Sequence, residues 1–226
     1  MKRARLVQVL LSVVLLLSAL VAGADDRNLL PKYGSLPKEE WQKEADAVFI
    51  AGINQDYHGD RKKAAADFAA RGWQFLYAGD PDDAMRRFNQ AWLLNSNNGT
   101  ALWGMAAIEA DRGMFDESLQ LFAEAEKLVG NDINFSVDYA RTVGVAGAER
   151  HDDALLKSAF ERFAQIYRRA PKNGRNLKNW AMTLYKLERY SEAWEKVKLA
   201  EATPGKGNFD PGFLADLQEH MPRPTK

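Results

Sequence analysis

Along most of this chain, apolar residues recur three and four positions apart, which is the spacing of one face of an α-helix. Two consecutive stretches, residues 65–98 and 99–132, carry the same order of small and aromatic residues with a period of 34. The matching positions are Gly72, Ala84, Phe88 and Ala91 in the first stretch and Ala106, Ser118, Phe122 and Ala125 in the second. A fixed period of this size predicts repeated helical hairpins that stack on one another.

The repeated pattern resembles that of the tetratricopeptide repeat (TPR) family, whose unit is a helix, a turn and a second helix with small residues where the two helices touch. The resemblance implies an all-α fold, a TPR-like right-handed solenoid of helical hairpins with capping helices at both ends. The four hairpins that it implies are residues 65–98, 99–132, 133–173 and 174–207. Glu109 departs from the pattern, because it stands where the family usually has an aromatic residue.

The third hairpin carries an insertion of seven residues. Its small and aromatic pair is Ala159 and Phe163, whereas an unbroken period from the second hairpin would place the pair at positions 152 and 156. Seven residues are nearly two helical turns, so an insertion of this length turns the buried face of a helix by only about 20°. We therefore expect normal packing with a longer or bent first helix. Gly144 and Gly147 lower the intrinsic tendency of that helix to form.

Both flanks of the repeats are expected to contribute a capping helix. Residues 25–64 are interpreted as a leader, a helix that begins at Pro37, and the start of the first repeat helix. The helix after Pro37 lacks the small residues of the repeat, so we expect it to cover the open face of the first hairpin. Residues 208–226 are interpreted as a second capping helix, opened by Pro211, and a tail. Proline fits a first helical turn because the missing N–H has no partner there.

The N-terminal segment, positions 1–24, has the features of a secretory signal peptide. Three basic residues precede an apolar run over positions 6–21, and Ala22-Gly23-Ala24 forms an A-x-A cleavage site. We therefore expect export, to the periplasm of a bacterium. The apolar run is also just long enough to span a bilayer, so an uncleaved inner-membrane anchor facing the periplasm is the alternative.

Composition excludes several classes of site. The formal net charge of zero gives no basic face of the kind that nucleic-acid binding usually requires. The sequence contains no cysteine, which removes disulfides, thiol nucleophiles, cysteine-built metal sites and a lipoprotein anchor. Apolar residues make up 46% of the chain, which is enough for a continuous core.

Candidate catalytic and metal-binding motifs are weak. The three histidines, His58, His151 and His220, include no pair at the spacing of an H-E-x-x-H zinc site. His151 and the two aspartates after it are better explained as a cap of the following helix than as metal ligands. We therefore expect no enzyme activity, no metal site and no cofactor.

The resemblance also implies a binding surface, because the first helices of successive TPR hairpins line a concave groove. The residues at the matching positions are Trp73, Tyr77, Trp103, Asp111, Arg175, Lys178, Met182 and Tyr185. Aromatic and basic side chains in a groove suit a peptide partner. The tryptophans fit a second interpretation equally well, in which they pack against a neighbouring helix. The third hairpin receives no assignment, because the insertion obscures its register.

The leading hypothesis is an exported, non-catalytic TPR scaffold that binds a protein or peptide partner in the cell envelope, in assembly, secretion or quality control. One alternative is an inner-membrane-anchored TPR adaptor with an uncleaved signal. Another, of a different class, is a carbohydrate- or cell-wall-acting protein that uses the aromatic groove. No nucleic-acid partner is expected, and membrane contact is expected only if the signal is uncleaved. The sequence determines neither the partner nor the oligomeric state.

Cleavage after Ala24 has a direct readout. The N-terminal sequence of the protein recovered from the periplasmic fraction is expected to begin at Asp25. Cleavage also removes three of the 31 basic residues and none of the 31 acidic ones, so the mature chain has a formal charge of −3. A protein that begins at Met1 and stays in the membrane fraction would select the anchored alternative.

Overall fold

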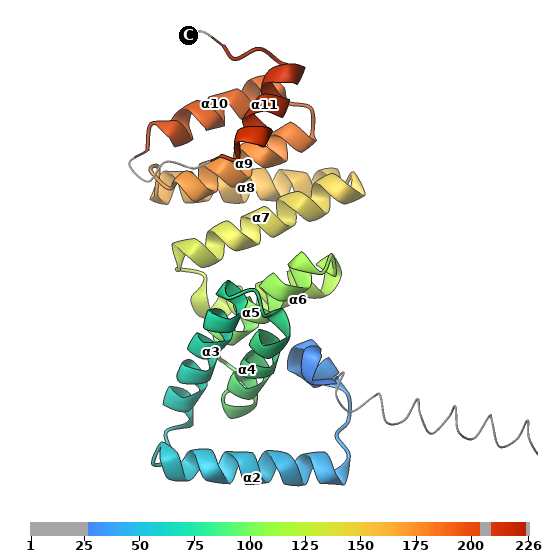
Figure 1. Ribbon diagram of the computed structural model, residues 1–226, viewed down its shortest axis with the longest axis vertical. Helices are drawn as coiled ribbons and strands as arrows, with labels where there is room; N and C mark the ends of the chain where they lie inside the picture. Colours follow the sequence, from blue (N-terminus) through green and yellow to red (C-terminus); the bar gives the residue numbers. More distant parts are fainter. Residues whose placement is uncertain (1–26, 204–208, 225–226) are drawn as a thin grey trace, which may run out of the picture. The chain divides into compact units, whose positions relative to one another are not determined.

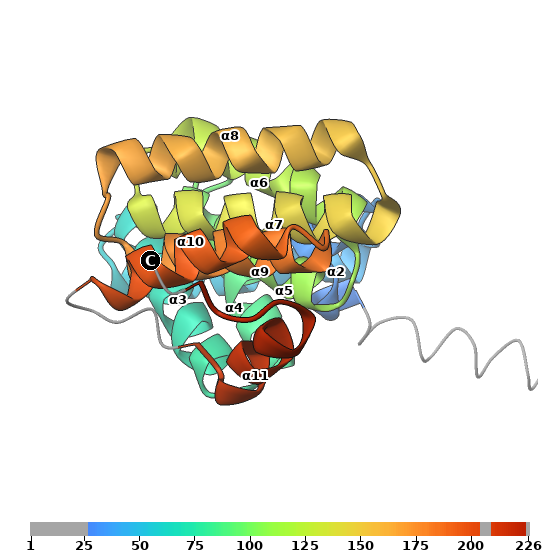
Figure 2. The same cartoon turned by 90° about the horizontal axis from the view of Figure 1, so that it is seen from above.

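The computed structural model describes residues 27–203 and 209–224, and all regular structure in these two ranges is helical (Figures 1 and 2). The all-α fold class predicted from the repeats is confirmed. The predicted signal peptide and the last residues of the fourth predicted hairpin lie outside the described residues. No helix in the described ranges is both long enough and apolar enough to cross a membrane.

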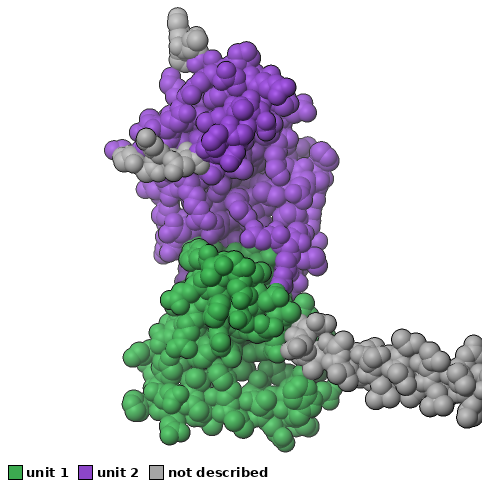
Figure 3. All heavy atoms as spheres, viewed as in Figure 1, with its two compact units in different colours: residues 1–108 green, residues 109–226 purple. Residues whose placement is uncertain are grey.

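The chain divides into two compact units, Met1–Ile108 and Glu109–Lys226, which Figure 3 colours separately. The first unit contains the 3-10 helices η1 (Arg27–Leu29) and η2 (Pro31–Ser35) and the helices α2 (Glu40–Asp56), α3 (Arg61–Tyr77) and α4 (Pro81–Leu94). The unit boundary falls inside α5 (Gly99–Asp111). The second unit contains α6 (Phe115–Val129), α7 (Ile133–Arg150), α8 (Asp153–Arg169), α9 (Gly174–Lys186), α10 (Tyr190–Glu201) and α11 (Pro211–His220).

Short polar side chains fix the starts of most of these helices. At an N-cap the side-chain oxygen accepts a hydrogen bond from one of the backbone N–H groups that the helix leaves without a partner. The residues that do so are Asp60, Asp80, Asp132, Asp152, Asn173 and Asp210. Asp80 is followed by Pro81 at the first helical position, where the missing N–H of proline costs no hydrogen bond.

The helix after the leader begins later than predicted. Pro37 lies outside it, and α2 begins at Glu40 with Glu39 as its N-cap. The side chain of Gln42 accepts a hydrogen bond from the backbone N–H of Glu39 at 2.9 Å, and the Glu39 side chain accepts one from the backbone of Gln42 in return. This reciprocal capping box satisfies two N–H groups at once, which explains why the helix starts here.

The leader is folded rather than extended. The side chain of Asn89 on α4 donates hydrogen bonds to the backbone oxygens of Asn28 and Leu30, at 3.0 and 2.9 Å, and accepts one from the N–H of Tyr33 at 3.3 Å. Lys32 and Tyr33 have left-handed backbone conformations, which are costly for residues with a side chain. The three bonds to the fully buried Asn89 offset that cost and hold the leader on α4.

Two glycines let the ring of Phe88 fill the core of the first unit. A Cβ atom on Gly72 of α3 would lie 2.5 Å from Phe88 Cε1, and one on Gly104 of α5 would lie 2.1 Å from Phe88 Cζ. Phe88 is completely buried between these two backbones. The predicted role of Gly72, close approach of two helices, is therefore confirmed.

The extra length of the third hairpin lies mainly in its first helix. Helix α7 has 18 residues, against 13 in α5 and 13 in α9, and it contacts both α8 and α9 (Figures 1 and 2). The glycines of α7 face those neighbours. A Cβ on Gly144 would lie 2.8 Å from the hydroxyl oxygen of Thr183, and one on Gly147 would lie 3.0 Å from Leu156 Cγ. Close packing thus explains two residues that weaken the helix in isolation.

Helix α11 covers the last hairpin of the second unit. Leu217 of α11 is completely buried in a cluster with residues of α9 and α10. The members of that cluster are Ala181, Leu184, Ala193, Trp194, Val197 and Leu217. Just beyond α11, the backbone oxygen of Met221 accepts a hydrogen bond from the indole N–H of Trp194 at 3.0 Å.

The contact between Phe88 and Gly104 gives a stability prediction. Gly104→Ala is expected to lower the free energy of unfolding by about 1–3 kcal/mol, because the new methyl group overpacks a filled core. Urea denaturation followed by circular dichroism measures the change.

The matched control shortens the opposing ring. In a Phe88→Leu background, the same Gly104→Ala change is expected to cost clearly less, because the atoms that clash with the methyl group are gone. Equal costs in the two backgrounds would contradict the assignment of the glycine to this contact.

Candidate functional site

An open groove of about 470 Å³ lies between α7 and α9 in the second unit. Two of its lining residues come from α7 and six from α9, and they are Arg141, Val145, Arg175, Lys178, Asn179, Met182, Thr183 and Lys186. Those of α9 recur at spacings of three and one, so they share one face of that helix. Leu177, Ala181 and Leu184 point away from the groove into the core and are buried. The amphipathic pattern of α9 therefore fixes which of its side chains reach the groove.

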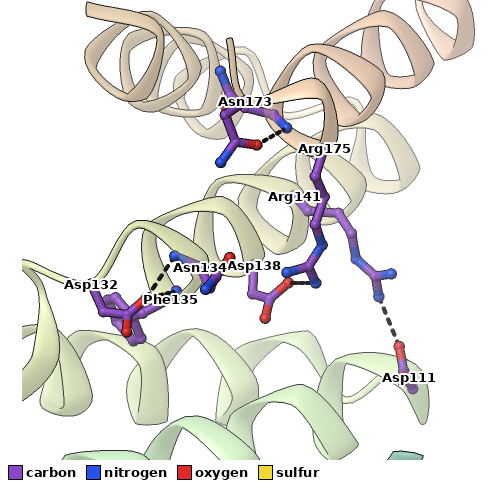
Figure 4. A network of polar contacts seen from close by, with 9 residues as sticks. Asp111, Asp132, Asn134, Phe135, Asp138, Arg141, Asn173 and Arg175 are labelled. Carbon is purple, nitrogen blue, oxygen red and sulfur yellow. Dashed lines mark hydrogen bonds and ion pairs between the residues drawn. The ribbon is translucent and has the colours of Figure 1, made fainter. Parts of the chain in front are cut away.

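Charged pairs cross the helices that surround the groove (Figure 4). Arg141 of α7 donates to Asp111 of α5 at 2.8 Å, and Arg175 of α9 donates to Asp138 of α7. At the other end of α9, the ammonium of Lys186 lies 3.8 Å from a carboxylate oxygen of Glu149. Most of these side chains are substantially exposed, and exposed ion pairs are worth only about 0–1 kcal/mol each. The carboxylates of a ligand could therefore replace Asp111, Asp138 or Glu149 as partners of the basic side chains at little cost in stability.

The groove also offers uncharged polar groups. The hydroxyl of Thr183 donates a hydrogen bond to the backbone oxygen of Asn179 at 3.0 Å. The side-chain amide nitrogen of Asn179 is buried and has no acceptor within the described part of the chain. An unused buried donor is costly, but this nitrogen is too enclosed for a ligand in the groove to reach it directly.

Three of the lining residues are predicted from the sequence, and five are not. Arg175, Lys178 and Met182 were expected and lie together in the groove. Arg141 and Val145 were missed because the third hairpin received no register. A usable signal existed: Ala140, which is completely buried, lies one full repeat period after Ala106, so the repeat stays in phase until after this position.

The predicted aromatic residues of the first unit form a cluster of their own. The Trp73 ring centroid lies 4.7 Å from that of Trp103, 5.6 Å from that of Tyr77 and 5.7 Å from that of Phe88. The indole N–H of Trp73 donates to the backbone oxygen of Thr100 at 3.4 Å. Both tryptophans are half-buried, whereas Tyr77 is 81% exposed. Trp73 and Trp103 thus satisfy both sequence interpretations in part, since each packs on a neighbour and keeps some exposed surface.

No family profile and no curated protein sequence matches this chain. Among solved structures, the fold is similar to the crystal structure of a thermophilic TPR protein from Thermus thermophilus, with a TM-score of 0.60 and 18% sequence identity. The match covers 70% of this chain and 84% of that one. The fold is that of a TPR protein. At this level of identity the likeness establishes the fold alone, and a TPR fold is a helical scaffold that typically serves protein–protein interaction rather than catalysis.

Two further residues that the sequence placed in a groove, Asp111 and Tyr185, lie outside the lining of the groove between α7 and α9. Asp111 accepts a hydrogen bond from Arg141, and Arg141 is the residue of this pair that lines the groove. Tyr185 faces the C-terminal helix instead, with its ring centroid 5.3 Å from that of Phe213 and 5.8 Å from that of His220. Helix α11 packs over that end of α9 and so determines where Tyr185 lies. Because α11 is not part of the 34-residue repeat, the repeat pattern could not predict this contact. Within the described residues, no three acidic or histidine side chains gather in a way that could hold a metal ion.

Glu109, the departure from the TPR pattern, is a buried carboxylate at the end of α5. Its residue surface is only 3% exposed, and it accepts a hydrogen bond from Arg112 at 2.9 Å. Burial raises the pKa of Glu109 above its ordinary value of 4.5, and the nearby Arg112 opposes that rise only in part. The folded protein therefore binds a proton at Glu109 more tightly than the unfolded chain does.

This raised pKa predicts a pH dependence of stability. The contribution of Glu109 is greatest below the ordinary carboxyl pKa, and it is lost as the pH rises from there through the raised pKa of the folded state. Glu109→Gln is uncharged at every pH, so its free energy of unfolding is expected to fall less than that of the wild type over this window. Urea unfolding of both proteins across a pH series measures the difference, and parallel curves would show that Glu109 does not titrate in this way.

Proposed function

We propose that this protein is a non-catalytic scaffold of the cell envelope that binds an acidic segment of a protein partner in the groove between α7 and α9. The TPR fold supports the interaction role. The observation that carries the proposal is the lining of the groove, in which four basic side chains and no acidic one among the described residues surround an open volume of about 470 Å³.

The basic groups favour a carboxylate-rich ligand. The lining contributes Arg141, Arg175, Lys178 and Lys186, and the carboxylates that pair with this set lie at the edges of the groove, outside its lining. Attraction between a basic groove and an acidic segment increases the rate of association and weakens as salt is added. Val145 and Met182 add apolar contacts, and a Met side chain adapts to varied partners.

The envelope location rests on the sequence of the N-terminal segment, positions 1–24, with its basic start, apolar run and A-x-A site. A scaffold in that compartment meets partners in assembly, secretion or quality control. Recovery of the protein only from the cytosol, with this segment intact, would remove the location from the proposal.

Affinity capture from an envelope extract tests the binding role. The wild-type protein as bait is compared with the double variant Arg175→Glu, Lys186→Glu, which reverses two charges of the groove. The captured partner is expected to bind the double variant at least about tenfold more weakly, and added salt is expected to weaken wild-type binding. Isothermal titration with the purified partner gives both affinities.

The matched control is Arg168→Glu on α8, which reverses an exposed basic residue outside the groove lining. It is expected to bind the partner as the wild type does. Thermal unfolding of each variant checks that the fold is kept. A partner that binds the folded double variant with unchanged affinity would show that the groove is not its binding site.

A further inference from the structure

Helices α7 and α9 run in the same direction and keep a constant offset in sequence along the groove. Arg175 donates to Asp138, which precedes it by 37 residues (Figure 4). The ammonium of Lys186 lies 3.8 Å from a carboxylate oxygen of Glu149, which precedes it by the same number of residues. These two ion pairs lie at opposite ends of the groove, so the two helices stay level with each other over its length, about 16 Å.

The same offset places two further pairs of residues level with each other, between the two ion pairs. Arg141 of α7 is level with Lys178 of α9, and Val145 is level with Met182. All four residues line the groove. The groove therefore has a basic level, to which neither helix contributes a carboxylate, and directly beside it an apolar level.

The distance between the basic and the apolar level matches the spacing of an extended chain. Lys178 and Met182 are four residues apart on α9, which corresponds to about 6 Å along the helix axis. In an extended segment, side chains two positions apart point to the same side and lie about 6.6–6.8 Å apart. An acidic and an apolar side chain two positions apart can therefore reach both levels at once.

The width of the groove also favours an extended ligand. A helical ligand would offer a similar spacing, because residues four positions apart on a helix are separated by about 6 Å. Such a helix is about 10–12 Å across with its side chains, whereas helices in contact, as α7 and α9 are, lie only about 8–10 Å apart. The groove between them is too narrow for a helix to enter, but a single extended chain fits.

We propose that the groove recognises a short pattern in an extended segment of its partner, an acidic residue and an apolar residue two positions apart. This inference rests on the proposed function and narrows its acidic segment to that pattern. The carboxylate binds at the level of Arg141 and Lys178, and the apolar side chain packs on Val145 and Met182. Arg141 also donates to Asp111 at 2.8 Å, but a guanidinium has several N–H donors and can serve both carboxylates. The intervening residue points to solvent and carries no preference.

Synthetic peptides test the spacing, by NMR titration of the purified, isotope-labelled protein. Each peptide carries one aspartate and one leucine in a background of glycine and serine, placed one, two or three positions apart and in either order. A peptide with the two residues two positions apart is expected to bind about tenfold more tightly than the others, because at the odd spacings the side chains point to opposite sides. The order that binds more tightly gives the direction of the chain in the groove, and the amide signals that shift are expected to be those of α7 and α9.

A change of specificity tests the apolar level. Met182→Lys makes this level basic, so the variant is expected to prefer a peptide with two aspartates two positions apart over the aspartate–leucine peptide, by about tenfold. The wild type is expected to show the opposite preference. Met114→Lys changes another exposed methionine of the same unit, outside the groove lining, and is the matched control that keeps the wild-type preference. Thermal unfolding checks that both variants are folded.

The outcomes separate this inference from the proposed function. Equal binding of all three spacings to α7 and α9 would overturn the pattern and leave a basic groove that binds acidic segments. A folded Met182→Lys variant with the wild-type preference, or no binding of any peptide at its highest soluble concentration, would also end the inference. An alanine-rich helical peptide with aspartate and leucine four positions apart is expected to bind more weakly than the extended pattern, and tighter binding would show that the ligand is a helix instead. The capture experiment on the charge-reversed groove remains the separate test of the proposed function.

Discussion

The close approach of helices at small residues is the constraint on which both units depend. Phe88 is enclosed because Gly72 and Gly104 have no side chain where its ring lies. In the second unit, Gly144 and Gly147 bring α7 close to α9 and α8 in the same way. Glycine lowers the intrinsic helix tendency of α3, α5 and α7, so the stability of these helices comes from packing.

Close packing on one side of a helix determines which of its side chains are left on the other side to face a groove or solvent. In α9 the side chains of Leu177, Ala181 and Leu184 are buried in the core, so its basic and polar residues and Met182 face the groove. Charges around the groove are then balanced across helices rather than along them, by Asp111, Asp138 and Glu149. Pairs of this kind hold the basic side chains in place without removing them from solvent. This arrangement supports the proposal that the groove binds an acidic segment, because the basic side chains are already positioned at little cost to the fold.

Helix α2 and the leader show what happens where the repeat pattern ends. The leader is held by a single buried amide, Asn89, whose side chain makes three hydrogen bonds to leader backbone. On α2, Phe49 packs on Phe68 of α3, whereas Trp41 and Val48 remain 58% and 75% exposed. The cap therefore buries less of its apolar surface than the repeat helices do.

The sequence by itself determined the all-α, TPR-like fold and the role of small residues such as Gly72 where helices touch. The 34-residue period and the spacing of apolar residues within each helix are properties of the chain itself, so they predict the fold before any tertiary contact is known. It did not predict that Pro37 lies outside α2, because the capping box of Glu39 and Gln42 competes with proline for the first turn.

Only the tertiary structure decided which charged residues meet and which aromatic residues stay exposed. Arg141 pairs with Asp111 from α7, the helix whose register could not be predicted because of the insertion. Tyr185 packs on Phe213 of α11, a segment outside the repeats. The docking of the leader on Asn89 joins residues more than fifty positions apart. Such contacts depend on how helices pack after they form, and the periodicity of one helix carries no information about the side chains of another.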